Sequence, residues 1–139
     1  NHGGTTNDPD FLGPLFERVG SKRLGLTLDT GNFYWFGHPL SKVYQLFETF
    51  ASRVFHTHLK SINFPADQRE RRRPMGWEYE KYQCPIFRGD IDFRRVVRIL
   101  VGAGYANDLC VEDEGLSRFP AAERGQVLAK EIRYLKEML

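Results

Sequence analysis

Three short apolar stretches alternate along this chain with longer segments of helical periodicity, and this alternation is the strongest constraint on its fold. The apolar stretches cover residues 24–29, 54–60 and 109–114. Apolar side chains recur with helical spacing over residues 9–19, 40–51, 92–102 and 121–139. Repeated alternation of strand and helix implies a parallel sheet with right-handed crossover connections. The sequence therefore predicts an α/β fold.

Length and composition restrict the range of functions. A chain of 139 residues, 41% of them hydrophobic, forms one globular domain over residues 1–139. The formal net charge of +2 gives no support for a nucleic-acid partner. No apolar run approaches the roughly 20 residues of a membrane span. Neither Cys84 nor Cys110 lies in a metal-binding spacing, so we expect a reduced, cytoplasmic protein.

The predicted strands end in residue types that bind metals. Because side chains alternate along a strand, Thr27 and Asp29 share one face, as do His56 and His58. Glu112 ends the apolar part of the third stretch. The carboxyl ends of parallel strands meet at one edge of a sheet, and ligand sites lie there. We therefore expect Asp29, His58 and Glu112 to form a metal site.

Two carboxylates and an imidazole suit a divalent ion such as Mn²⁺, Mg²⁺, Co²⁺ or Zn²⁺. Such an ion can bind neighbouring oxygens of a sugar and stabilise an enediolate while a carboxylate moves the proton. We predict that Glu112 moves the proton and that Lys60 neutralises the oxyanion. In the alternative interpretation, each acid or histidine is a hydrogen-bonded structural group and Lys60 reaches solvent.

A long polar connection, residues 61–90, follows the second predicted strand, and connections of this length are usually functional or mobile. Its basic run, 69–73, either clamps a phosphate or acidic substrate or forms a solvated charged surface. Its aromatic residues Trp77, Tyr79 and Tyr82 either line a sugar pocket or anchor the connection to the rest of the domain. Gly89-Asp-Ile-Asp92 is interpreted as a turn that leads into a helix cap.

Five segments together resemble the xylose isomerase-like TIM-barrel family of sugar and sugar-phosphate isomerases and epimerases. They are Asn1-His-Gly-Gly4, Leu28-Asp-Thr-Gly-Asn32, His56-Thr-His-Leu-Lys60, Gly89-Asp-Ile-Asp92 and Val111-Glu112. Their order and spacing match the C-terminal half of the family's barrel. The resemblance implies a partial (β/α)8 TIM barrel, roughly the last four βα units with parallel strands, truncated at its N-terminal half.

The resemblance also implies one divalent ion held by a glutamate, an aspartate, a histidine and a second glutamate. Asp29, His58 and Glu112 correspond to the last three ligands, whereas the first glutamate commonly stands just before the Asn-His-Gly-Gly segment and so would precede Asn1. This chain alone would then be a weak catalyst. Because His56 lies one layer deeper than His58, we expect it to be buried and hydrogen-bonded rather than a metal ligand. The predicted substrate-binding residues are His2, Asn32, His56 and Arg88.

Three functions remain open from the sequence. The first is a metal-dependent isomerase or epimerase that acts on a sugar or sugar phosphate through an enediolate. The second is an endonuclease IV-like phosphoesterase, against which Asn32 counts because it stands where some family members carry a histidine. The third is a non-catalytic half-barrel fragment. Since four βα units leave unpaired strand edges, the expected partners are a second copy of the chain or the missing half-barrel, beside a small carbohydrate.

Overall fold

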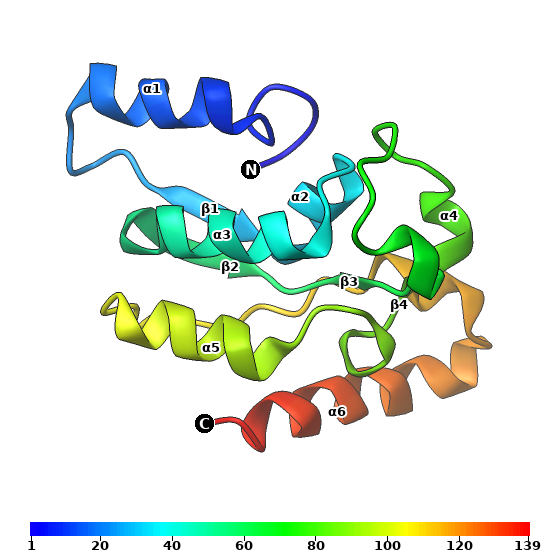
Figure 1. Cartoon of the computed structure of the whole chain (residues 1–139). Helices are drawn as coiled ribbons and strands as arrows, with labels where there is room; N and C mark the ends of the chain where they lie inside the picture. The colour runs from blue at the N-terminus through cyan, green and yellow to red at the C-terminus, as the bar shows by residue number, and fades with distance from the viewer.

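The computed structural model describes residues 1–139. In it, helices and strands alternate largely as the sequence predicts (Figure 1). The helices are α1 (Pro9–Val19), α2 (Thr30–Trp35), α3 (Leu40–Phe50), α4 (Tyr79–Tyr82), α5 (Phe93–Gly102) and α6 (Ala121–Lys136). The strands are β1 (Leu26–Asp29), β2 (Val54–His58), β3 (Ser61–Ile62) and β4 (Gln83–Cys84). The short 3₁₀ helices are η1 (Ala51–Arg53), η2 (Ala66–Gln68), η3 (Ile86–Arg88) and η4 (Glu114–Arg118).

Strands β1 and β2 form a parallel pair, which confirms the α/β class. Leu28 lies opposite Thr57 and Asp29 lies opposite His58, so the polar strand ends are in register. The register shifts near Phe55, whose ring lies so close to Gly25 that a Cβ there would approach it to 2.1 Å. The strands do not close into a barrel.

The prediction of a regular strand over residues 109–114 is wrong. Only one parallel bridge forms, between Leu59 and Val111. The amide of Leu59 donates to the carbonyl of Cys110 at 2.7 Å, and that of Glu112 donates to the carbonyl of Leu59 at 3.0 Å. No strand pairs with the other side of this segment, and the backbone hydrogen bonding does not continue beyond this single bridge. The bridge nevertheless brings Glu112 beside the end of β2.

The first strand leads directly into a helix where the sequence predicted a loop. Asp29 caps α2, because its Oδ1 accepts hydrogen bonds from the amides of Gly31 and Asn32, each at 3.0 Å. An aspartate at this position satisfies amide groups that have no partner within the helix. The second strand is also shorter than predicted, since β2 ends at His58 rather than at Lys60.

The long connection after β2 is ordered and folds back onto α2. Its ends pair as the short antiparallel strands β3 and β4. Between them, the amide of Arg73 donates to the carbonyl of Gly37 at 2.9 Å, and that of Gly76 donates to the carbonyl of Trp35 at 2.8 Å. Position 37 requires glycine, because its φ is +102° and a Cβ there would lie 2.0 Å from the carbonyl oxygen of Arg73.

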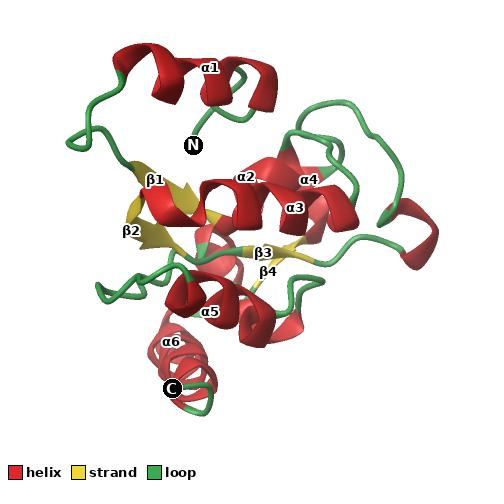
Figure 2. Cartoon of the chain, turned by 60° about the vertical axis from the view of Figure 1, so that its left-hand side comes forward, coloured by secondary structure: helices red, strands yellow, loops and turns green.

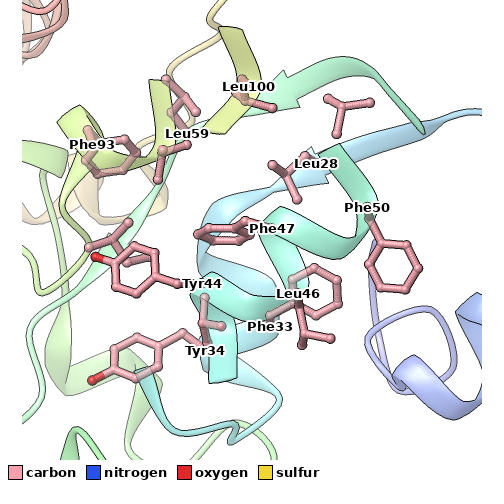
Figure 3. Packing of buried hydrophobic residues seen from close by; sticks show 14 of the residues in the cluster. Leu28, Phe33, Tyr34, Tyr44, Leu46, Phe47, Phe50, Leu59, Phe93 and Leu100 are labelled. Carbon is pink, nitrogen blue, oxygen red and sulfur yellow. The ribbon is translucent and has the colours of Figure 1, made fainter. Parts of the chain in front are cut away.

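The apolar core lies between the parallel strands and helices α3 and α5 (Figure 3). Leu28, Phe33, Phe47 and Phe93 are completely buried, and the rings of Phe33 and Phe47 are 6.3 Å apart. Burying each such side chain contributes about 1.5–3 kcal/mol. Helices α1 and α6 lie at opposite ends of the molecule, with the strands between them (Figures 1 and 2). None of the helices combines the length and apolar character required to cross a bilayer.

Candidate metal centre

Asp29, His58 and Glu112 come together at the carboxyl ends of three neighbouring extended segments. Each offers one ligand atom, and these atoms all lie within 4.8 Å of one another. Asp29 is buried, whereas the side chains of His58 and Glu112 are 36% and 38% exposed. The three residues line a cavity of about 380 Å³ without hydrophobic lining, which we call the metal cavity. Its other lining residues are Asn1, His2, Thr27, Asn32, Lys60 and Glu114.

Lys60 is the cation at the centre of this acidic site. Its Nζ lies 2.9 Å from Asp29 Oδ2, 2.8 Å from Glu114 Oε1 and 3.3 Å from Glu112 Oε2. Burial acts to lower the pKa of Lys60, but the attraction of Asp29 and the hydrogen bond to Glu114 outweigh it and raise the pKa. Lys60 therefore stays protonated and can donate to an anionic oxygen, but it cannot serve as a base near neutral pH.

The Asp29 carboxylate has one oxygen engaged in local structure and one directed into the cluster. Its Oδ1 caps α2, and its Oδ2 faces Lys60. Burial, together with the nearby charge of Glu112, raises the pKa of Asp29 to about 6 against the opposing effect of Lys60. Asp29, Glu112 and Glu114 together carry more negative charge than the single ammonium group of Lys60 neutralises.

The side chains present fit a divalent ion. Glu112 Oε2 is buried and accepts no hydrogen bond, although His58 Nδ1 and Lys60 Nζ each lie 3.3 Å away. A buried carboxylate oxygen without a hydrogen-bond partner is costly unless a cation binds it. Two carboxylates and one imidazole are a ligand set suited to Mn²⁺, Mg²⁺, Co²⁺ or Zn²⁺.

Two predicted substrate-binding residues, His2 and Asn32, line the metal cavity. The side-chain amide of Asn32 donates to the carbonyl of Asn1 at 3.0 Å and lies 3.5 Å from His2 Nδ1. Asn1 in turn accepts a hydrogen bond from the amide of Asp29 at 2.9 Å. These contacts hold the first residues of the chain against the end of β1, which aligns His2 with the metal cluster.

Two other predicted residues do not reach the site. His56 is not buried as expected: its side chain is 40% exposed, lies outside the cavity and contacts Asp108 at 3.0 Å. The expected hydrogen bond is present, but its partner Asp108 is itself 56% exposed, so the pair lies at the surface. Arg88 stacks on Phe87, with its Cζ 5.6 Å from the ring centroid, and lines a separate surface groove with Lys130. The turn that carries Arg88 packs against β3 and α6, and Arg88 does not line the metal cavity.

The basic run lines neither cavity and divides between two roles, because Arg71 and Arg72 are exposed, as expected of a solvated surface, whereas Arg73 is built into the domain. Arg73 is 5% exposed, donates to the carbonyls of Gln68, Arg71, Tyr34 and His38, and lies over the rings of Tyr34 and Phe64. In the same connection Arg69 pairs with the buried carboxylate of Asp90 at 2.9 Å, and Arg72 stacks on Phe36. Arg72 and Arg73 therefore anchor the connection to α2 and its C-terminal end, whereas Arg69 ties the connection to its own last residue, Asp90.

The aromatic residues of the connection divide between two roles. Trp77 and Tyr82 stack on each other and pack against Phe64, so they anchor the loop. Tyr79 instead donates its hydroxyl to Glu114 and lines a second cavity of about 220 Å³ beside the metal cavity. Trp35 lines the same cavity but was not among the predicted site residues. The only sequence signal was its place just after the Asp-Thr-Gly-Asn segment.

Comparisons with known proteins agree with the fold. The family profile described as xylose isomerase-like TIM barrel matches residues 1–138. A crystal structure of a xylose isomerase domain protein from Planctomyces limnophilus superposes with a TM-score of 0.66 at 22% identity, covering 94% of this chain and 41% of that chain. The chain thus spans less than half the length of that protein. No curated protein matches the sequence. Because the family profile matches nearly every residue, the chain belongs to the xylose isomerase-like TIM barrel family.

Proposed function

We propose that this chain supplies the metal-binding half of a sugar isomerase or epimerase that acts through an enediolate. The family includes sugar isomerases and epimerases as well as endonuclease IV-like enzymes. The observation that supports the sugar reaction is the convergence of Asp29, His58 and Glu112 within 4.8 Å, beside a protonated lysine. Enediolate chemistry needs this combination of anionic ligands, a carboxylate and a fixed positive charge.

Each side chain has a role that follows from its surroundings. A divalent ion held by Asp29, His58 and Glu112 would polarise the carbonyl and hydroxyl oxygens of a bound sugar. Glu112, which is 38% exposed at the cavity wall, moves the proton between neighbouring sugar carbons. Lys60 donates to the oxygen that becomes negative in the enediolate. His2 and Asn32 orient the sugar hydroxyls along the other wall.

The phosphoesterase alternative has less support. Cleavage of abasic DNA requires cations along the strand, because phosphate contacts dominate the affinity for DNA. The arginines that could provide them, Arg69, Arg72 and Arg73, are engaged with Asp90, Phe36 and backbone carbonyls. Asn32 adds no imidazole to the cluster.

The proposal is tested by incubating the Mn²⁺-loaded protein with a panel of ketoses and aldoses in D₂O. Since the chain alone is expected to be a weak catalyst, we expect slow conversion of at least one sugar, with deuterium incorporated beside the carbonyl, both followed by NMR. Glu112→Gln slows this reaction by about 100-fold or more, the usual contribution of a general acid–base group. The matched control Glu123→Gln, at an exposed position on α6, leaves the rate unchanged. Absence of both conversion and exchange with metal bound would refute the proposed function.

A further inference from the structure

The second cavity adjoins the metal cavity and differs from it in chemistry. The two share His2, Asn32, Lys60 and Glu114 in their walls, so they form one continuous site. The smaller cavity, which we call the aromatic pocket, adds Trp35 and Tyr79. A ligand whose reacting carbons lie at the metal ligands would therefore extend its far end into a space bounded by two aromatic rings and a carboxylate.

Glu114 fixes the electrostatic character of the aromatic pocket. Its side chain is 40% exposed, its Oε1 accepts from Lys60 at 2.8 Å, and its Oε2 accepts from the hydroxyl of Tyr79. The carboxylate is thus held in place by two donors while it faces the cavity. A carboxylate so placed accepts hydrogen bonds from sugar hydroxyls and repels a phosphate.

The lysine near the pocket is already paired with acids. Of the basic side chains that line the two cavities, Lys60 contacts three carboxylates. The remaining basic groups are the imidazoles of His2 and His58. With Asp29, Glu112 and Glu114 against one lysine, a divalent ion brings the site to neutrality and leaves no excess positive charge for a phosphate dianion.

The loops that hold phosphate in many TIM barrels are acidic in this chain or have their arginines outside the site. Phosphate sites in such barrels are frequently built from the loops after the last two strands. In this chain the corresponding loops follow β2 and Val111. In the first, Arg69 pairs with Asp90, Arg72 stacks on Phe36 and no arginine lines either cavity, and the second begins with Glu112, Asp113 and Glu114.

We infer that the site takes an unphosphorylated sugar, whose non-reacting end lies in the aromatic pocket between Trp35 and Tyr79 with its hydroxyls on Glu114. This inference rests on the proposed function and specifies its substrate class. Aromatic rings pack against the C–H faces of a sugar, and a carboxylate accepts from its hydroxyls, which together recognise a neutral polyol end. Glu114 and Trp35 are then the residues that determine specificity.

Calorimetry on the Mn²⁺-loaded protein with two matched pairs tests this substrate class. The pairs are D-fructose with D-fructose 6-phosphate, and D-xylulose with D-xylulose 5-phosphate, which carry the phosphate at the non-reacting end. We expect the neutral member of a pair to bind at least about tenfold more tightly, and Glu114→Gln to narrow this ratio by improving binding of the phosphate. The control Glu123→Gln, which makes the same charge change at an exposed position on α6, leaves the ratio unchanged.

The outcomes separate the inference from the function on which it rests. A sugar phosphate that binds as tightly as its neutral partner, or more tightly, overturns the substrate class and leaves the isomerase proposal standing. An unchanged ratio in Glu114→Gln, with Mn²⁺ affinity and circular dichroism retained, overturns the role of Glu114. If neither member of either pair binds and no sugar is converted, the proposed function itself fails.

Discussion

Lys60 Nζ lies 2.9 Å from Asp29 Oδ2, and both side chains are almost entirely withdrawn from solvent. The lysine therefore occupies the position next to the oxygen that a metal ion would bind. In the protein without metal, Lys60 neutralises the buried carboxylate of Asp29. A buried carboxylate without a cationic partner would be strongly destabilising. A divalent ion and the ammonium group accordingly compete for the same oxygen.

Replacing this lysine should separate its structural and competing effects. In Lys60→Met we expect the metal-free protein to lose on the order of 3 kcal/mol of stability, because the buried Asp29 carboxylate loses its partner. Mn²⁺ affinity rises, because the competing charge is gone. Urea denaturation with and without Mn²⁺ measures both effects. Weaker Mn²⁺ binding by a folded Lys60→Met would show that the lysine does not compete with the ion.

Two substitutions at Asp29 distinguish its capping role from its ligand role. Asn caps helices as well as Asp, so Asp29→Asn keeps the hydrogen bonds to the amides of α2 but loses the metal-binding charge. Asp29→Ala loses both, and we expect it to be about 1 kcal/mol less stable than Asp29→Asn. Denaturation of the two variants measures this difference. Equal stabilities would mean that the cap contributes nothing.

Glu131 should make the protein less stable as the pH rises. It is fully buried on α6, its Oε1 accepts from the amide of Ile86 at 2.9 Å, and Oε2 has no partner. Burial raises the pKa of Glu131 from 4.5 to about 7, so the folded state holds a proton that the unfolded state releases at lower pH. Stability contributed by this proton is present below pH 4.5 and is lost as the pH rises to about 7.

The loss attributed to Glu131 is on the order of 3 kcal/mol between these two pH values. Glu131→Gln keeps the acceptor for Ile86 without a titrating group, so it should be more stable than wild type at pH 8 and lose most of this dependence. Thermal melts from pH 4.5 to 8 test this. A wild-type curve that matches Glu131→Gln at every pH would contradict the assignment.

Arg73 should stabilise the long connection through geometry that lysine cannot reproduce. Its guanidinium reaches several carbonyls at once while it lies over the rings of Tyr34 and Phe64. A lysine offers one compact charge in place of this planar fork. We expect Arg73→Lys to cost about 2 kcal/mol, whereas Arg71→Ala, at an exposed position, stays within about 0.5 kcal/mol. Equal effects in the two variants would mean that the basic run is merely a solvated surface.

The sequence contained enough information for the alternation of elements and for the metal cluster. Apolar periodicity identified α1, α3 and α5, and the strand ends brought Asp29 and His58 into the predicted register. These features depend on local pattern and on the geometry of parallel strands. The short helix α2 was predicted as a loop because its signal is a single capping aspartate rather than a periodic pattern.

Features that depend on distant contacts could not be predicted. Residues 109–114 have strand composition but form a single bridge, to Leu59 just beyond β2, since a strand needs a neighbour as well as a pattern. The link from Tyr79 to Glu114 joins residues far apart in the sequence, and no spacing reveals it. The sequence left the arginine run open between an anion clamp and a solvated surface, because it does not show that Arg69 pairs with Asp90 or that Arg73 is buried against α2.

Titration of the protein with Mn²⁺ by calorimetry tests the metal centre most directly. The wild type should bind one Mn²⁺ per chain, and Asp29→Asn, His58→Ala and Glu112→Gln should each lose this binding while His56→Ala retains it. Circular dichroism of every variant checks that the fold is kept. A wild type that binds no Mn²⁺, or three folded cluster variants that bind it as well as the wild type, would contradict the account.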